Sequence, residues 1–339
     1  MARHSCNCFK LLILCSMCLI LTPKLSAQLS LLLRPDAAER LSANTLPFEY
    51  FNHYIFVTLT VNGTPGMQFL FDTGTSADIL NLSTSKRLGL KPESIRKERD
   101  LGLGNDKVAV AAAKNVDVKM GTAHAAHILA LVDLHGLELV MGHRIDGILG
   151  FPVLRDFIVE LDFKNQTLTL LPIKGYKYHG RGETMFLRQD KYYATIPVTL
   201  ESKHNFQHDA TLEIDTGSGA TMLLYPALIN QAHVVVNVKQ PANLKAYGVG
   251  GYFHVQLGTL RTASMGNTHV VSLPVYMMDT TPNIGAKLKF GGVVGTAILE
   301  KYQKIIFNIP AHRVVFERDD TMDLSKNQSM PPTLTPLLR

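Results

Sequence analysis

Short runs of apolar residues, alternating or continuous and separated by turn residues, follow one another along most of the chain. Residues 53–61, HYIFVTLTV, alternate and are rich in β-branched and aromatic side chains. They end at an Asn-Gly dipeptide, residues 62–63, which favours a two-residue hairpin turn. Residues 193–200, YATIPVTL, show the same pattern. Helical patterns are short, namely a serine-capped STSKRLGL segment after Asn81 and residues 226–232. The pattern predicts a mainly β protein.

The order of these runs occurs twice. Residues 67–80, MQFLFDTGTSADIL, are similar to residues 211–224, TLEIDTGSGATMLL. In each copy an apolar strand runs into Asp-Thr-Gly and a hydroxyl residue, and another apolar strand follows. A second motif comes at nearly the same interval in both copies, as DGILG at residues 146–150 and GGVVG at 291–295. Each copy ends in two more strand-like pieces, at residues 159–170 and 305–316. One Asp-Thr-Gly is a common turn, but a repeated set of motifs indicates two related lobes.

The repeat divides the chain into segments. We expect an N-terminal lobe over residues 47–175 and a C-terminal lobe over residues 183–317, joined by a Gly/Lys/Tyr-rich stretch. Residues 28–46 are a lead-in, and residues 318–339 form a polar, proline-rich tail.

The first 27 residues have the pattern of a secretory signal peptide. A basic start precedes the apolar run at residues 11–21, and a small residue, Ala27, stands at a plausible cleavage site. The apolar run is shorter than the roughly 20 residues that span a bilayer as a helix. We therefore predict cleavage near Ala27 and a secreted or periplasmic protein with no stable membrane span after cleavage.

Cleavage would change the composition. All four cysteines lie in that segment: Cys6, Cys8, Cys15 and Cys18. The mature chain would then have no disulfide scaffold, cysteine-ligated zinc or cysteine nucleophile. The formal charge of +6 would lose three Lys/Arg residues and fall to +3. Without a basic cluster, this charge argues against a nucleic-acid partner.

The repeated aspartates are the strongest candidates for chemistry. If the two copies pack about a pseudo-twofold axis, Asp72 and Asp215 face each other across a cleft. Two carboxyl groups so close share one proton, because both cannot ionise cheaply. The ionised member can then take a proton from water, while the protonated member hydrogen-bonds the carbonyl under attack. This chemistry needs no cofactor and no metal.

With these motifs present twice, the sequence resembles the two-lobed aspartic peptidases, with a pepsin-like layout and compact lobes similar to retropepsin-like bacterial proteins. The resemblance implies an all-β fold of two acid-protease β-barrel lobes with short helices and the active site between them. It implies that Asp72 and Asp215 are the catalytic dyad, and that Thr73 and Thr216 form a hydroxyl lock between the lobes. Two flap hairpins are implied by four glycines: Gly102, Gly104, Gly248 and Gly250.

The residues around the dyad extend this interpretation. Gly74 and Gly217 permit the backbone geometry of the two turns. Hydroxyl donation from Thr75 and Ser218 would favour ionised carboxylates and lower the pKa of the pair. We therefore expect activity in acidic solution.

The sequence predicts an aspartic endopeptidase that acts on polypeptides as a monomer, since one chain holds both lobes. The alternative is a catalytically idle peptide-binding or inhibitor protein on the same fold. Such proteins usually lack one dyad member, and this chain has both.

Overall fold

The structure of the protein is a computed structural model. It describes residues 44–93, 97–100, 102–104, 106–190, 192–202, 206–232, 244–279 and 288–318. The predicted signal peptide and nearly all of the predicted lead-in and tail lie outside these residues. The chain divides into residues 1–43 and residues 44–339, and only the second unit is described below.

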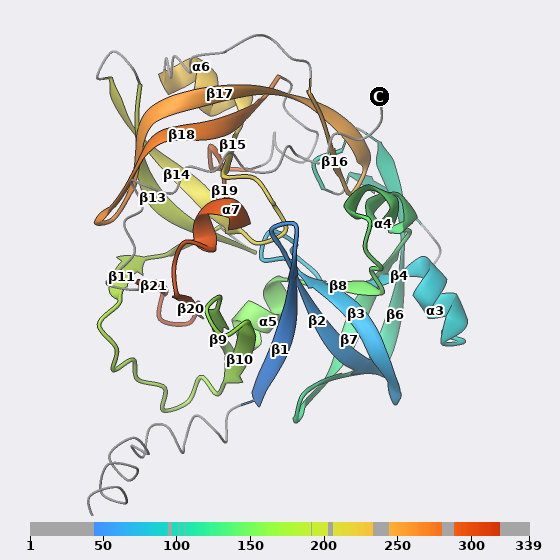
Figure 1. The fold of residues 1–339 in the computed structure, drawn as a ribbon. Coiled ribbons are helices and arrows are strands. Elements are labelled where there is room, and N and C mark those ends of the chain that lie inside the picture. Colours follow the sequence, from blue (N-terminus) through green and yellow to red (C-terminus); the bar gives the residue numbers. More distant parts are fainter. Residues whose placement is uncertain are drawn as a thin grey trace, which may run out of the picture. The chain divides into compact units, whose positions relative to one another are not determined.

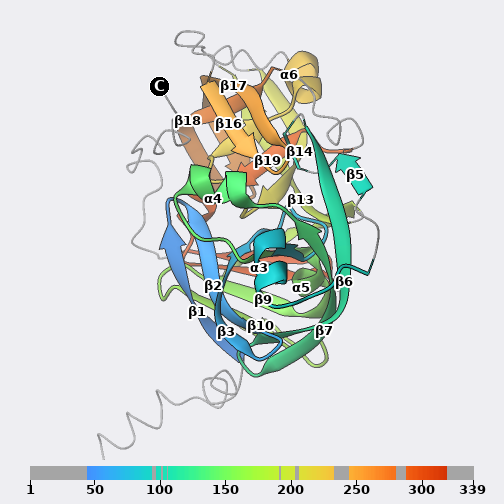
Figure 2. The same cartoon turned by 90° about the vertical axis from the view of Figure 1, so that its right-hand side faces the viewer.

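Within the described residues, the first half has ten strands and the second half has eleven. The strands of the first half are β1 (Asn44–Phe51), β2 (Tyr54–Val61), β3 (Thr64–Phe71), β4 (Ile79–Asn81), β5 (Lys97–Asp100), β6 (Lys107–Met120), β7 (Ala123–Val132), β8 (Gly147–Leu149), β9 (Ile158–Asp162) and β10 (Thr167–Leu171). Strands β2 and β3 are joined by residues 62–63, both with positive φ, which is the predicted hairpin turn. The order β2-β3-β8-β4-β7-β6 closes on itself, because β2 also pairs with β6. Figure 2 shows β1 and β2 on one side of this barrel and β6 on the other.

The second half repeats this topology with eleven strands. They are β11 (Glu183–Phe186), β12 (Arg188–Asp190), β13 (Tyr193–Glu201), β14 (Gln207–Asp215), β15 (Met222–Leu224), β16 (Leu244–Gly248), β17 (Gly251–Met265), β18 (Thr268–Met278), β19 (Gly292–Gly295), β20 (Lys304–Asn308) and β21 (Arg313–Glu317). The order β13-β14-β19-β15-β18-β17 matches that of the first half strand for strand, and β13 pairs with β17 to close it. The repeat in the sequence is therefore a repeat of one barrel.

A sheet of six strands joins the two halves. Its order is β11-β21-β20-β9-β10-β1, and the central pair β9 and β20 comes from different halves. Figure 1 shows β9, β10, β20 and β21 side by side, below the second barrel and beside the first. The predicted strand-like pieces at the end of each copy thus meet in one sheet. Apolar side chains of both halves also form one buried cluster, which includes Phe71, Leu161, Ile214 and Phe307.

In the part of the chain that the structure describes, helices are few and short. They are α3 (Leu82–Arg87), α4 (His135–Met141), α5 (Phe151–Asp156), α6 (Pro226–Ala232) and α7 (Thr296–Leu299). Helix α6 has the predicted bounds. Helix α3 differs from the prediction, because its N-cap is Asn81 and not a serine. The Asn81 side chain accepts a hydrogen bond from the Ser83 N–H.

Candidate active site

Each Asp-Thr-Gly turn lies at the end of a barrel strand that pairs with a parallel strand of the same barrel. Strand β3 runs parallel to β8, and Asp72 directly follows β3, where its N–H donates to the Leu149 carbonyl at 2.9 Å. In the second half, Asp215 ends β14 opposite Gly295 of the parallel strand β19. The DGILG and GGVVG motifs therefore lie directly beside the two aspartates. Their parallel strands hold the turns at the same place in both barrels.

The two turns are joined by reciprocal hydrogen bonds between Thr73 and Thr216. The N–H of each donates to the hydroxyl of the other, both at 3.0 Å. The Thr73 hydroxyl donates to the Ile214 carbonyl at 2.6 Å, and the Thr216 hydroxyl donates to the Phe71 carbonyl at 2.7 Å. Both threonines are fully buried. This arrangement is the hydroxyl lock that the resemblance implied.

The glycine of each turn contacts the aspartate of the other turn. A Cβ placed on Gly74 would lie 2.7 Å from Cγ of Asp215, and one on Gly217 would overlap the carboxyl group of Asp72. Neither glycine has positive φ. Glycine is therefore required here for the close approach of the turns and not for a left-handed backbone.

The two carboxyl groups are positioned by donors from their own turns and hydrogen-bond each other. Asp72 accepts from the Gly74 N–H and from the Thr75 hydroxyl, both at 2.9 Å. Asp215 accepts from the Gly217 N–H at 2.8 Å. Within the described residues, the Ser218 hydroxyl forms no such bond to Asp215, although the Ser218 backbone does. The two sides of the pair are thus not equivalent.

Burial dominates the electrostatics of the pair. It raises the pKa of Asp72, although Thr75, Gly74 and Asp215 offset part of this by hydrogen bonding. It raises the pKa of Asp215 further, and the nearby charge of Asp72 adds to the increase. The sequence analysis expected hydroxyl donation to lower the pKa of the pair. That expectation is wrong in sign, because the loss of solvation outweighs the donated hydrogen bonds.

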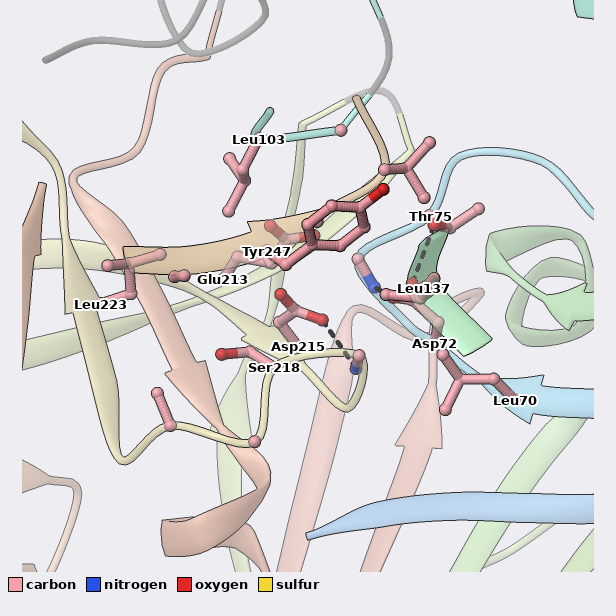
Figure 3. A pocket seen from close by; sticks show the side chains of 18 of the residues that line it. Leu70, Asp72, Thr75, Leu103, Leu137, Glu213, Asp215, Ser218, Leu223 and Tyr247 are labelled. Carbon is pink, nitrogen blue, oxygen red and sulfur yellow. Dashed lines mark hydrogen bonds between the residues drawn. The ribbon is translucent and has the colours of Figure 1, made fainter. Parts of the chain in front are cut away.

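A pocket lies above the pair. Figure 3 shows Asp72 and Asp215 at its floor, with Tyr247 above them. Leu70 and Leu137 lie on the Asp72 side, whereas Glu213 and Leu223 lie on the Asp215 side. Most of the lining is apolar or aromatic, which suits a ligand that buries side chains.

Two hairpin loops meet over this pocket. One lies between β5 and β6, and the other between β16 and β17. The Gly104 N–H donates to the Val249 carbonyl at 3.2 Å, and the Asp106 N–H donates to the Gly250 carbonyl at 2.8 Å. Gly102 and Gly248 line the pocket. Of the four glycines of the implied flaps, Gly102, Gly104 and Gly250 lie in these loops, and Gly248 ends β16 beside them.

Tyr54 and Glu213 are among the pocket side chains that sequence reasoning missed. Tyr54 follows the β1–β2 turn; burial raises its pKa to about 12, and it hydrogen-bonds the backbone of Gly219. Glu213 stands two residues before Asp215. Since side chains alternate along a strand, this spacing was the signal that would have placed Glu213 on the face of the aspartate.

Other kinds of site have little support in the described part of the chain. Within it, no group of three or more His, Cys, Asp or Glu side chains could hold a metal ion. The same residues contain no helix long and apolar enough to cross a membrane.

Comparisons with known proteins agree with this geometry. A model of an aspartyl protease family matches residues 57–153, which include Asp72 and the DGILG motif. The aspartic proteinase from Irpex lacteus, a solved structure, is similar at 12% identity with a TM-score of 0.51. The alignment covers 84% of this chain and 100% of that one. No curated protein matches significantly. The chain therefore has the fold of the aspartic peptidases, and the predicted fold class is confirmed.

Proposed function

We propose that the protein is an aspartic endopeptidase that hydrolyses peptide bonds with water activated between Asp72 and Asp215. The fold and the match to the family model support a peptidase role. The observation that carries the proposal is the pair of hydrogen-bonded, buried carboxyl groups at the floor of the pocket. If the signal peptide is cleaved near Ala27, the mature chain would act outside the cytoplasm. It would act as a monomer, since one chain supplies both Asp-Thr-Gly turns.

The reaction needs one proton on the pair. The ionised carboxylate takes a proton from water as the water oxygen attacks the peptide carbonyl. The other carboxyl group donates a hydrogen bond to the carbonyl oxygen, which gains negative charge. Asp72 accepts a hydrogen bond from the Thr75 hydroxyl, which favours its ionised form, whereas within the described residues the equivalent Ser218 hydroxyl donates none to Asp215. We therefore assign the shared proton to Asp215 in the free enzyme.

The loops between β5 and β6 and between β16 and β17 would act as flaps. Hydrogen bonds join the two loops beside the pocket, and we propose that a polypeptide enters when the loops separate. Once bound, the substrate backbone would replace these bonds and be shielded from water.

An unfolded protein mixture tests the proposal. The protein is incubated with it from pH 3 to pH 8, with and without a statine-type transition-state analogue, and cut sites are identified by mass spectrometry. We expect cleavage that the analogue blocks and that Asp72→Asn and Asp215→Asn each abolish. If a folded wild-type protein binds the analogue and cuts nothing at any pH, the protein is an idle binder. If either variant cuts as fast as wild type, the dyad mechanism is wrong.

A further inference from the structure

Equivalent positions of the two barrels carry different side chains at the pocket. Leu70 stands two residues before Asp72 on β3, and Glu213 stands two residues before Asp215 on β14. Residues two apart on a strand share a face, so each lies on the face of its aspartate. Both line the pocket. The pseudo-symmetric site is therefore apolar at this position on one side and carboxylic on the other.

The strands beside Glu213 do not satisfy its carboxyl group. Its partners across the sheet are Thr195 on β13 and Val293 on β19. The Thr195 hydroxyl donates to the Arg188 carbonyl at 2.9 Å instead. In the first barrel, the matching neighbours of Leu70 are Phe56 and Ile148, both apolar.

Glu213 is only 3% exposed, and its Oε1 has no hydrogen-bond partner among the described residues. A buried carboxyl group without a partner costs stability, and such groups are uncommon unless a ligand satisfies them. Burial, together with the charges of Asp215 and Asp72, raises its pKa well above the ordinary value. A cation beside Glu213 would reverse this by favouring the ionised form.

The rest of this side of the pocket suits a long side chain with a charged end. Its walls are apolar or aromatic, from Leu223, Tyr225, Phe253, Tyr276 and Leu288. No lysine or arginine is among the described residues that line the pocket. Such walls accommodate the aliphatic stem of lysine or arginine, and aromatic rings attract the cation. A carboxylate in an otherwise apolar specificity pocket is also how trypsin selects basic side chains.

We propose that Glu213 makes the two sides of the site chemically different, so that the protein selects peptides with an apolar side chain on the Asp72 side and lysine or arginine on the Asp215 side. This inference rests on the proposed peptidase function and names the substrate class of the same site. A neutral donor such as glutamine would gain less, because hydrogen bonds between charged groups are stronger than neutral ones.

The test compares wild type with Glu213→Gln and Glu213→Leu on a peptide library, with cut sites read by mass spectrometry. The leucine variant makes the two sides of the pocket alike. We expect wild type to favour a basic residue at one of the two positions that flank the cut bond. In both variants this preference should disappear, with the ratio of kcat/KM for basic peptides to kcat/KM for all-apolar peptides falling on the order of 10- to 100-fold.

Leu70→Gln is the matched control at the equivalent position. It should change the preference at the opposite flanking position and leave the basic preference intact. The inference is overturned if wild type cuts without a preference for basic residues, or if it prefers glutamine or asparagine. It is also overturned if the Glu213→Leu variant keeps the basic preference. In each case the peptidase function stands.

A binding measurement separates the inference from catalysis. Two statine-type peptides are compared by calorimetry, one with lysine and one with norleucine on the Asp215 side. Tighter binding of the lysine peptide to wild type, lost in Glu213→Leu, supports the inference even if the protein proves to cut nothing. Equal binding of the two peptides, or no binding of either, overturns it.

Discussion

Thr73 and Thr216 each donate their backbone N–H to the hydroxyl of the other at 3.0 Å, and both are fully buried. Each hydroxyl also donates to a carbonyl two residues before the other threonine in the sequence, Ile214 or Phe71. The two turns that carry Asp72 and Asp215 are thus held together by four hydrogen bonds that water cannot replace.

Thr73→Val or Thr216→Val should therefore damage both stability and activity. Each replaces a hydroxyl with a methyl group of similar size and leaves an N–H and a carbonyl buried without partners. At about 1–3 kcal/mol for each of the two unsatisfied groups, we expect a loss of about 2–6 kcal/mol, measured by urea unfolding. Thr→Ser keeps the hydroxyl and should lose far less. If valine and serine variants unfold at the same urea concentration, the hydroxyl is not what joins the turns.

Asp72→Asn and Asp215→Asn should abolish activity and stabilise the fold at neutral pH. A raised pKa in the folded protein means that the native state binds more protons than the unfolded chain. Stability therefore falls as pH rises from the unfolded pKa, about 4, to the folded pKa, by up to about 1.4 kcal/mol per pH unit. An amide removes this loss.

Thermal unfolding at two pH values checks this sign. At pH 7 the asparagine variants should melt higher than wild type. At pH 3, where the aspartates are protonated in both states, the difference should vanish. Variants that melt lower than wild type at pH 7 would mean that the charged pair stabilises the fold.

Thr75→Val should shift the pH dependence of activity upward. The Thr75 hydroxyl donates to Asp72 at 2.9 Å and lowers the pKa of that carboxyl group. Without it the pKa of Asp72 rises, so the pair keeps both protons, and stays inactive, up to a higher pH. The acidic limb of the kcat/KM profile should move up, by about half a unit to one unit. Thr75→Ser keeps the donor and should leave the profile in place, and a downward shift in the valine variant would contradict the assignment.

Cross-linking the two loops should block access to the pocket. A Cβ on Gly102 would lie 2.9 Å from Cβ of Val249 and 2.3 Å from its carbonyl oxygen, so the loops must move slightly apart to reach disulfide geometry. Gly102→Cys with Val249→Cys should lose activity when oxidised and regain it on reduction. The four native cysteines all lie within residues 6–18, so a chain cleaved near Ala27 has no competing thiol. Each single-cysteine variant is the control, and an oxidised double variant that still cuts unfolded protein would mean that the loops need not separate.

The sequence alone determined the fold class, because strand alternation and turn dipeptides are local signals. Residues 53–61 and the Asn-Gly turn after them needed no distant partner to be recognised. The repeated Asp-Thr-Gly and its companion motif paired Asp72 with Asp215, since two copies of one lobe bring equivalent positions together. A local helical pattern predicted the bounds of α6, residues 226–232.

Features that depend on contacts between residues far apart in the sequence were decided only by the tertiary structure. The pairing of β9 with β20, the meeting of Gly104 with Val249 and the capping of α3 by Asn81 all rest on packing that no local pattern specifies. Burial is the clearest case. It reversed the pKa direction expected from Thr75 and Ser218, and it left Oε1 of Glu213 without a hydrogen-bond partner among the described residues. Desolvation is set by everything that surrounds a group, whereas a sequence motif shows only its nearest neighbours along the chain.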